Sequence, residues 1–96
     1  MSVLNTVALI TAKPGSEVVV KAALTELLGH TRSEEGCVRY DLFESAATPG
    51  TFVTIEEWDS QDALDAHLGS AHIAAALDAT KDALAAPPAI HPLTAA

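Results

Sequence analysis

The chain has little positive charge, a single cysteine and few aromatic side chains. Its 96 residues contain 5 Lys and Arg against 13 Asp and Glu, with one Trp, one Tyr and two Phe. A net charge of -8 repels phosphate backbones and anionic lipid headgroups, which argues against nucleic acid or a membrane as a partner. Because Cys37 is the one cysteine, neither an internal disulfide nor a Cys-x-x-Cys zinc site is predicted, and we expect a half-buried strand residue there.

Long apolar runs are also missing. Polar residues interrupt every apolar stretch well before the about 20 residues that a membrane span needs, and residues 1–12 lack the basic segment of a secretion signal. We therefore expect a cytoplasmic protein. With 49% hydrophobic residues, the chain fits one domain over 1–96, with a core over about 3–84 and a tail over 85–96. Since so short a chain buries a small share of its apolar surface alone, a homodimer is expected.

Four segments have the composition of β-strands. They are rich in β-branched and aliphatic residues, and turn-forming residues separate them. These strands are predicted over 3–12, 37–45, 51–58 and 89–93. The connection 46–50 favours a hairpin between the second and third strands, and Pro92 suits an edge position for the last. An antiparallel sheet is the predicted result.

Helical patterns separate these strands. Residues 16–32 carry apolar side chains at three- and four-residue intervals, and Ser16 is expected to cap this helix. A second helix begins after Ser60, breaks at Gly69-Ser70, and continues until Pro87-Pro88 stops it. The order of elements is βαββαβ, which predicts an α+β, ferredoxin-like fold with the helices on one sheet face. The other face is then left for a second copy of the sheet.

Three pieces of sequence carry motifs in a characteristic order: G-C-V-R-Y over 36–40, F-V-T-I-E-E-W over 52–58, and D-S-Q-D-A-L-D-A-H-L-G-S-A-H-I over 59–73. Together they resemble the antibiotic biosynthesis monooxygenase (ABM) family of dimeric α/β barrels. The most specific part is E-x-W followed by a helix bearing H-x-x-S-x-H, and the likeness extends over about 3–84. The resemblance implies cofactor-independent oxidation of phenols or quinols, haem degradation, or membership without an established activity.

Oxygen chemistry without a flavin or a metal requires the substrate to supply the electrons. The protein must then deprotonate a phenol and hold its anion beside O2 in a dry pocket. We expect a cofactor-independent monooxygenase that oxidises a small phenolic or quinol-type aromatic substrate with O2, using no cofactor and no metal. The alternative, from another class of function, is a non-catalytic or stress-related dimeric module that binds a small hydrophobic ligand. Haem degradation is a third possibility.

Two inward-facing residues are the first candidates for catalysis. The resemblance suggests that the indole N–H of Trp58 donates to a substrate oxygen, although a core tryptophan would fit the same position. His67 follows Leu64 by one helical turn and faces inward with it, where an imidazole could exchange a proton with the substrate. A histidine bound to backbone beneath the helix would fit equally well.

Two further candidates depend more on context. His72 opens the third helical stretch and could be a pocket base or a capping surface residue. Asn5 lies on the same side of its strand as Val7 and would need a partner if buried, and in haem-degrading relatives an asparagine near this place assists the distal pocket. The resemblance to those relatives places the axial histidine where this chain has Leu77, which cannot ligate iron.

The remaining expectations concern the pocket wall and the charged residues. The substrate-binding wall is predicted to come from Tyr40, Phe52, Leu64, Ile73 and Leu77. Arg32 and Arg39 could hold an anionic substrate or pair with acidic groups on the surface. Glu56 and Glu57 are adjacent on a strand, so they point to opposite faces and form no catalytic dyad. No metal-ligand cluster is evident from the sequence.

Overall fold

Seven elements follow one another in the predicted order. The computed structural model describes residues 3–96, so residues 1 and 2 of the predicted domain lie outside the described part. The elements are β1 (Leu4–Thr11), α1 (Glu17–Thr31), β2 (Cys37–Glu44), β3 (Thr51–Trp58), α2 (Gln61–Leu68), α3 (Ala71–Thr80) and β4 (Ala89–Pro92). Within the described residues, none of the helices is long and apolar enough to cross a membrane.

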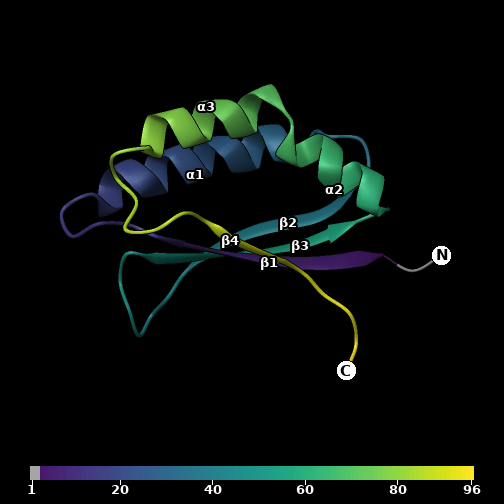
Figure 1. Cartoon of the computed structure of the whole chain (residues 1–96), viewed down its shortest axis with the longest axis horizontal. Coiled ribbons are helices and arrows are strands. Elements are labelled where there is room, and N and C mark those ends of the chain that lie inside the picture. The colour runs from purple at the N-terminus through teal and green to yellow at the C-terminus, as the bar shows by residue number, and fades with distance from the viewer. Residues whose placement is uncertain (1–2) are drawn as a thin grey trace.

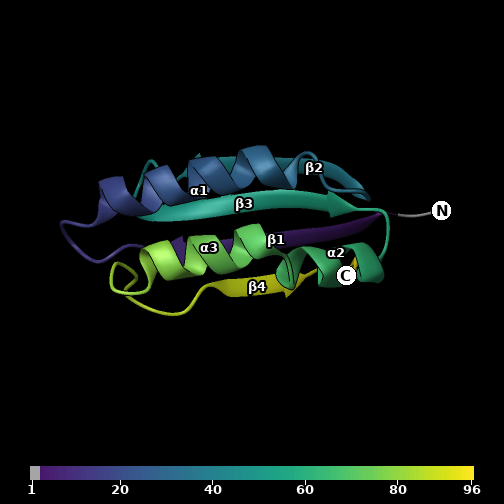
Figure 2. The same ribbon diagram turned by 90° about the horizontal axis from the view of Figure 1, so that it is seen from above.

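The four strands form one antiparallel sheet in the order β2-β3-β1-β4. All three helices lie on the same side of this sheet, and its other side is bare (Figure 1). Seen from above, α1 and α3 run side by side over the sheet, and α2 lies between the end of β3 and the start of α3 (Figure 2). The predicted α+β, ferredoxin-like fold is confirmed.

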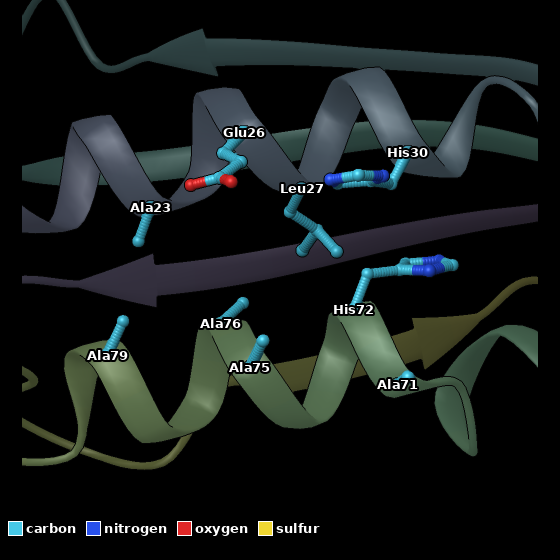
Figure 3. A pocket seen from close by; sticks show the side chains of 9 residues that line it. All are labelled: Ala23, Glu26, Leu27, His30, Ala71, His72, Ala75, Ala76 and Ala79. Carbon is cyan, nitrogen blue, oxygen red and sulfur yellow. The ribbon is translucent and has the colours of Figure 1, made fainter.

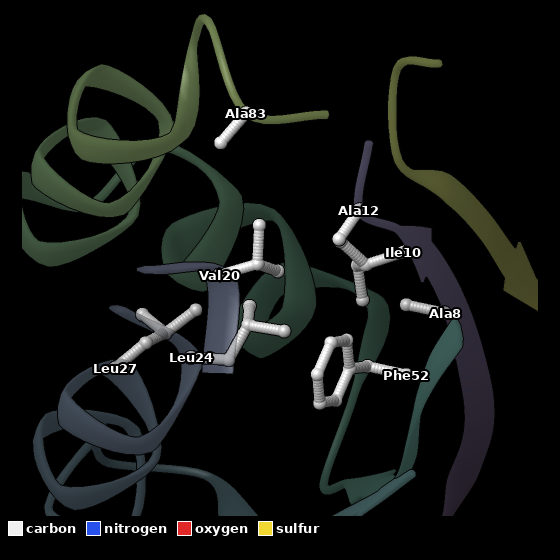
Figure 4. Packing of buried hydrophobic residues seen from close by; sticks show 8 residues of the cluster. All are labelled: Ala8, Ile10, Ala12, Val20, Leu24, Leu27, Phe52 and Ala83. Atoms are coloured by element: carbon white, nitrogen blue, oxygen red, sulfur yellow. The ribbon is translucent and has the colours of Figure 1, made fainter. Parts of the chain in front are cut away.

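The core lies between the sheet and α1. Side chains alternate between the two faces of the sheet along β1 and β3, so Ala8, Ile10 and Phe52 point toward the helices. There they pack with Val20 and Leu24 (Figure 4). A second buried cluster, made of Tyr40, Trp58 and Leu64, lies beneath α2. The two clusters hold the helices in place over the sheet, and the candidate site lies where they meet.

Serine side chains cap α2 and α3, but not α1. Ser60 accepts a hydrogen bond from the N–H of Ala63 at 3.1 Å, and Ser70 accepts one from Ile73 at 3.3 Å. The prediction that the Ser16 side chain caps α1 is wrong, since its hydroxyl makes no capping bond. The backbone of Ser16 has φ -107° and ψ 8°, set by the turn after Lys13, whereas a capping residue normally has an extended backbone.

The end of α3 also differs from the prediction. The helix ends at Thr80, well before the two prolines that were expected to stop it. Ala83 then donates to Thr80 and accepts from the N–H of Lys13, and Leu84 forms an isolated bridge with Ala12. The chain leaves the helix early because its backbone groups pair with the end of β1 instead.

A glycine turn brings the start of β2 against α2. Gly36 has φ +85°, a conformation that glycine adopts without strain, and a Cβ atom there would lie 2.6 Å from Cβ of Ala63. The α1–β2 turn therefore passes directly against α2. This close approach places Glu34, two residues earlier, beside the end of α2.

The bare side of the sheet is apolar at one end and charged at the other. Leu9 and Phe43 are 42% and 48% exposed there. At the other end Arg39 donates to Asp41 at 2.6 Å and lies 3.7 Å from Glu57. Pairing with acidic groups is thus the arrangement that Arg39 adopts.

Candidate active site

A cavity of about 330 Å³ lies between the sheet and the helix pair α2 and α3. Its wall is apolar except for four side chains, those of Tyr40, Glu56, His67 and Thr80. The apolar part of the wall consists of Ala8, Ile10, Leu24, Leu27, Leu68, Ile73, Ala76, Leu77, Leu84, Pro88 and Ile90. A hollow of this size and character suits a small aromatic or aliphatic molecule with one or two polar groups.

His67 is the titratable group most directly placed in this wall. It lies in the last turn of α2 and is 2% exposed, so the predicted inward direction is confirmed. Its Nδ1 lies 3.0 and 3.1 Å from the two carboxylate oxygens of Glu34. The ring packs beside Trp58, with centroids 4.7 Å apart, and beside Tyr40, with centroids 5.6 Å apart. The imidazole is therefore held by a carboxylate on one side and by aromatic rings on the other.

Trp58 lies behind His67 and is absent from the cavity wall. Its ring is fully buried, and its Nε1–H donates to Glu56 Oε1 at 2.9 Å. The other oxygen of Glu56 accepts from the Thr54 hydroxyl at 2.6 Å. Within residues 3–96 the indole N–H thus serves an internal carboxylate, which matches a core tryptophan better than a donor to a ligand.

Tyr40 joins the cavity wall from β2. It packs edge-on against Trp58 and is buried. Burial raises the pKa of the Tyr40 hydroxyl well above its ordinary value, and the nearby Glu56 carboxylate raises it further. The hydroxyl is therefore neutral at physiological pH, and a neutral hydroxyl can donate a hydrogen bond.

The other predicted wall residues divide between the cavity and the core. Ile73 and Leu77 line the cavity, as expected. Phe52 and Leu64 are instead packed in the two core clusters and do not reach the cavity. Asn5 is exposed, and the alternation along β1 turns it to the bare side of the sheet, away from the cavity.

His72 lies at a separate groove between α1 and α3. Figure 3 shows its ring facing that of His30 across the groove, and the two ring centroids are 5.7 Å apart. The rest of the groove is lined by small residues and by Glu26 and Leu27. His72 also contacts Glu34 Oε1 through its Nε2 atom, so it is joined to His67 through the same carboxylate.

Glu34 is the site residue that sequence reasoning missed. Its carboxylate bridges two histidines that follow it by more than thirty positions, and no local pattern predicts such a contact. Arg32, in contrast, donates to the Tyr40 carbonyl at 2.9 Å and to Asp41 at 2.9 Å, which leaves it outside the cavity. Cys37 is half-buried, as expected, and burial raises the pKa of its thiol.

Comparison with known proteins identifies the family. A family model described as "Antibiotic biosynthesis monooxygenase" matches residues 4–79. The chain belongs to the antibiotic biosynthesis monooxygenase family. This family member is 35% identical to YcnE of Bacillus subtilis (strain 168), which is named as a candidate monooxygenase. The match extends over 80 residues, which are 83% of this chain and 84% of YcnE.

Solved structures show the same fold over nearly the whole length of this antibiotic biosynthesis monooxygenase family member. PA3566 from Pseudomonas aeruginosa has a TM-score of 0.91 and 28% identity, and the match covers 100% of this chain and 96% of that one. Rv0793 from Mycobacterium tuberculosis has a TM-score of 0.88 and 33% identity, and the match covers 99% of this chain and 96% of that one. The family resemblance predicted from E-x-W and H-x-x-S-x-H is confirmed.

Proposed function

We propose that the chain is a cofactor-independent monooxygenase that oxidises a small phenolic or quinol-type aromatic substrate with O2 in the cavity between the sheet and the helices. The observation that carries the proposal is a mostly apolar cavity with one carboxylate-bound histidine in its wall. Apolar surroundings favour an aromatic substrate and keep water from the reacting anion. Membership of the family supports oxygen chemistry as the reaction class.

His67 is the general base of the proposed reaction. When Glu34 accepts the Nδ1–H of a neutral His67, the lone pair of the imidazole lies on Nε2. That atom has no hydrogen-bond partner within residues 3–96, and the ring lines the cavity. Glu34 is the positioning residue, since it fixes the tautomer and the direction of the ring. A base placed in this way typically contributes about 10²- to 10⁴-fold to the rate.

The reaction balances without a cofactor. Removal of a proton gives an electron-rich phenolate whose ring carbon is oxidised by O2. For an anthrone, a CH2 group becomes a carbonyl, so one oxygen atom enters the product, the other leaves as water, and the substrate supplies all four electrons. Tyr40 serves as a neutral donor to the substrate oxygen.

Trp58 and His72 support the base in this proposal. Trp58 packs against the His67 ring and holds it in place, while its N–H keeps Glu56 satisfied. His72 contacts Glu34 Oε1, the same oxygen that lies within hydrogen-bond distance of His67 Nδ1. Ile73 and Leu77 form part of the apolar wall against which the substrate ring packs.

The proposal is tested with purified protein and a panel of hydroquinones and anthrones. Oxygen consumption and product formation are measured in air and under anaerobic conditions. We expect turnover that requires O2 and that falls about 10²-fold or more in His67→Gln, whereas Lys81→Gln, an exposed change after α3, leaves it unchanged. Turnover no faster than in buffer alone would contradict the proposal.

A second candidate is the non-catalytic module that only binds a hydrophobic ligand. It is favoured by the internal hydrogen bonds of Trp58 and Glu56, which leave few polar groups for catalysis. Saturable binding of a hydroquinone, measured by quenching of the one tryptophan, without oxygen consumption would support this candidate over the first.

The proposal also includes a homodimer formed through the bare side of the sheet. Leu9 and Phe43 are large apolar residues left open to water on this side of the single chain. Exposed apolar patches of this kind mark association sites, and a second copy offers the same sheet face in return.

A further inference from the structure

Three side chains of the types that can bind metal ions, from separate segments, converge beside the cavity. Glu34 comes from the α1–β2 turn, His67 from the end of α2 and His72 from the start of α3. One donor atom from each lies within 4.8 Å of the others. The three side chains are 15%, 3% and 22% exposed, so the cluster is mostly shielded from solvent.

The donor set is specific in its chemistry. Two imidazole nitrogens and one carboxylate oxygen suit zinc and other first-row divalent transition metals, whereas calcium and magnesium prefer oxygen ligands. Two histidines and one acidic residue are also the three protein ligands of zinc sites that keep a fourth position open. Ligands at about 2.1 Å around a tetrahedral ion are about 3.4 Å apart, so small side-chain rotations bring these donors into place.

The backbone holds the three residues in position. The N–H of Glu34 donates to Thr31 at 3.0 Å, and its carbonyl accepts from Cys37 at 3.2 Å. Ser70 joins the two histidines, since its hydroxyl donates to the His67 carbonyl at 2.6 Å and caps the helix that carries His72. A site built on such supports loses little conformational freedom when an ion binds.

Electrostatics also favour a cation at this place. The chain carries a net charge of -8, which raises the local concentration of cations around it. Within residues 3–96, no salt bridge joins Glu34 to a lysine or an arginine. A divalent ion would supply a positive charge beside the Glu34 carboxylate, whose side-chain partners among residues 3–96 are the two histidines.

We propose that Glu34, His67 and His72 form a binding site for one first-row divalent transition-metal ion, bound through one carboxylate oxygen, His67 Nδ1 and His72 Nε2. A fourth coordination position stays open for water or a small ligand. An ion on His67 Nδ1 leaves the ring proton on Nε2, so the metal-bound chain lacks the general base of the proposed reaction. The inference is tested apart from that reaction, because metal binding is measured on the protein without substrate.

The experiment uses the full chain, treated with a chelator and then titrated with ZnCl2 in a calorimeter. We expect one Zn²⁺ ion per chain. Loss of a group that merely hydrogen-bonds a metal ligand costs 10–100-fold in affinity, so His72→Ala is expected to weaken binding by more than about tenfold. His91→Ala, which removes an exposed histidine from β4, should leave the affinity unchanged.

A spectroscopic measurement checks the ligands themselves. Co²⁺ should give the visible absorption of a low-coordinate nitrogen and oxygen site in the wild type, and this absorption should be lost in Glu34→Gln and His72→Ala. Circular dichroism of each variant establishes that it is folded. Zn²⁺ binding that is equally tight in folded wild type and His72→Ala, or no binding by the wild type, would overturn the inference and leave a hydrogen-bonded cluster only.

Discussion

Tyr40 offers a direct measurement at the scale of one residue, because it is the one tyrosine of the chain. Burial and Glu56 raise the pKa of its hydroxyl above the ordinary value of 10.0. We expect the near-ultraviolet absorbance of tyrosinate to appear in the native protein only at a pH clearly above 10. The same titration in strong denaturant should have its midpoint near 10, and a native midpoint there would contradict the burial of Tyr40.

The direction of the pKa shift also fixes the effect of pH on stability. Because the folded state binds the Tyr40 proton more tightly than the unfolded state does, this contribution is fully present below the unfolded-state pKa of about 10. It is lost as the pH rises through the folded-state pKa. The free energy of unfolding should therefore fall with alkaline pH, and Tyr40→Phe should reduce that fall.

The hydrogen bond between Trp58 and Glu56 gives a second prediction. Trp58→Phe removes the N–H donor and leaves a buried carboxylate oxygen without its partner. Bonds to charged groups contribute about 1.5–3 kcal/mol, so we expect a loss of about that size in the free energy of unfolding, measured with urea.

A nearly isosteric variant separates this hydrogen bond from packing. Thr54→Val removes the other donor to Glu56 with little change in volume and should destabilise the protein in the same direction. If both variants unfold at the wild-type urea concentration, Glu56 does not depend on these donors.

Some of these contacts could be predicted from the sequence and others could not. Glu56 and Trp58 are two residues apart on one strand, so the period of two already places them on one face. The partner of His67 is different, since Glu34 lies 33 positions away and reaches it only because the chain turns at Gly36 against α2. Contacts set by tertiary packing leave no local signal in one sequence.

At the scale of elements, Ser70 connects helix capping to the candidate site. Ser70→Ala removes the cap of α3 and the bond to the His67 carbonyl. Loss of a capping serine typically costs about 1 kcal/mol, and we expect at least that loss in the free energy of unfolding.

Ser16→Ala is the matched control for this prediction. Ser16 occupies the same position at the start of α1, but its hydroxyl makes no capping bond. Its replacement should change the free energy of unfolding by less than about 0.5 kcal/mol. Equal effects of the two substitutions would show that the Ser70 cap has no special role.

The elements themselves were well predicted because their signals are local. Alternating aliphatic residues, turn-forming Pro and Gly, and capping serines gave all four strands and three helices. The error at Ser16 arises from a local turn, in which its N–H donates to the Lys13 carbonyl, and the error at the end of α3 arises where the end of β1 competes for backbone hydrogen bonds. Helix propensity alone includes neither effect.

At the scale of the whole molecule, the proposed dimer predicts the effect of one charge. Leu9→Asp places a carboxylate in the middle of the bare sheet face, where pairing would bury it without a partner. We expect a folded monomer by light scattering after size-exclusion chromatography, where the wild type is a dimer.

Val18→Asp provides the comparison on the opposite side of the molecule. Val18 lies on α1 and is 81% exposed, so its replacement should leave the dimer intact. A wild-type protein that stays monomeric at high concentration, or a dimer that survives Leu9→Asp, would contradict pairing through this face.

The position of His67 has a further consequence for the molecule. One imidazole belongs both to the wall of the interior cavity and to the cluster with Glu34 and His72. Two ligands that share a residue cannot bind independently, and their coupling free energy is reciprocal. If an ion bound at the cluster changes the affinity of a cavity ligand by some factor, that ligand changes the affinity of the ion by the same factor.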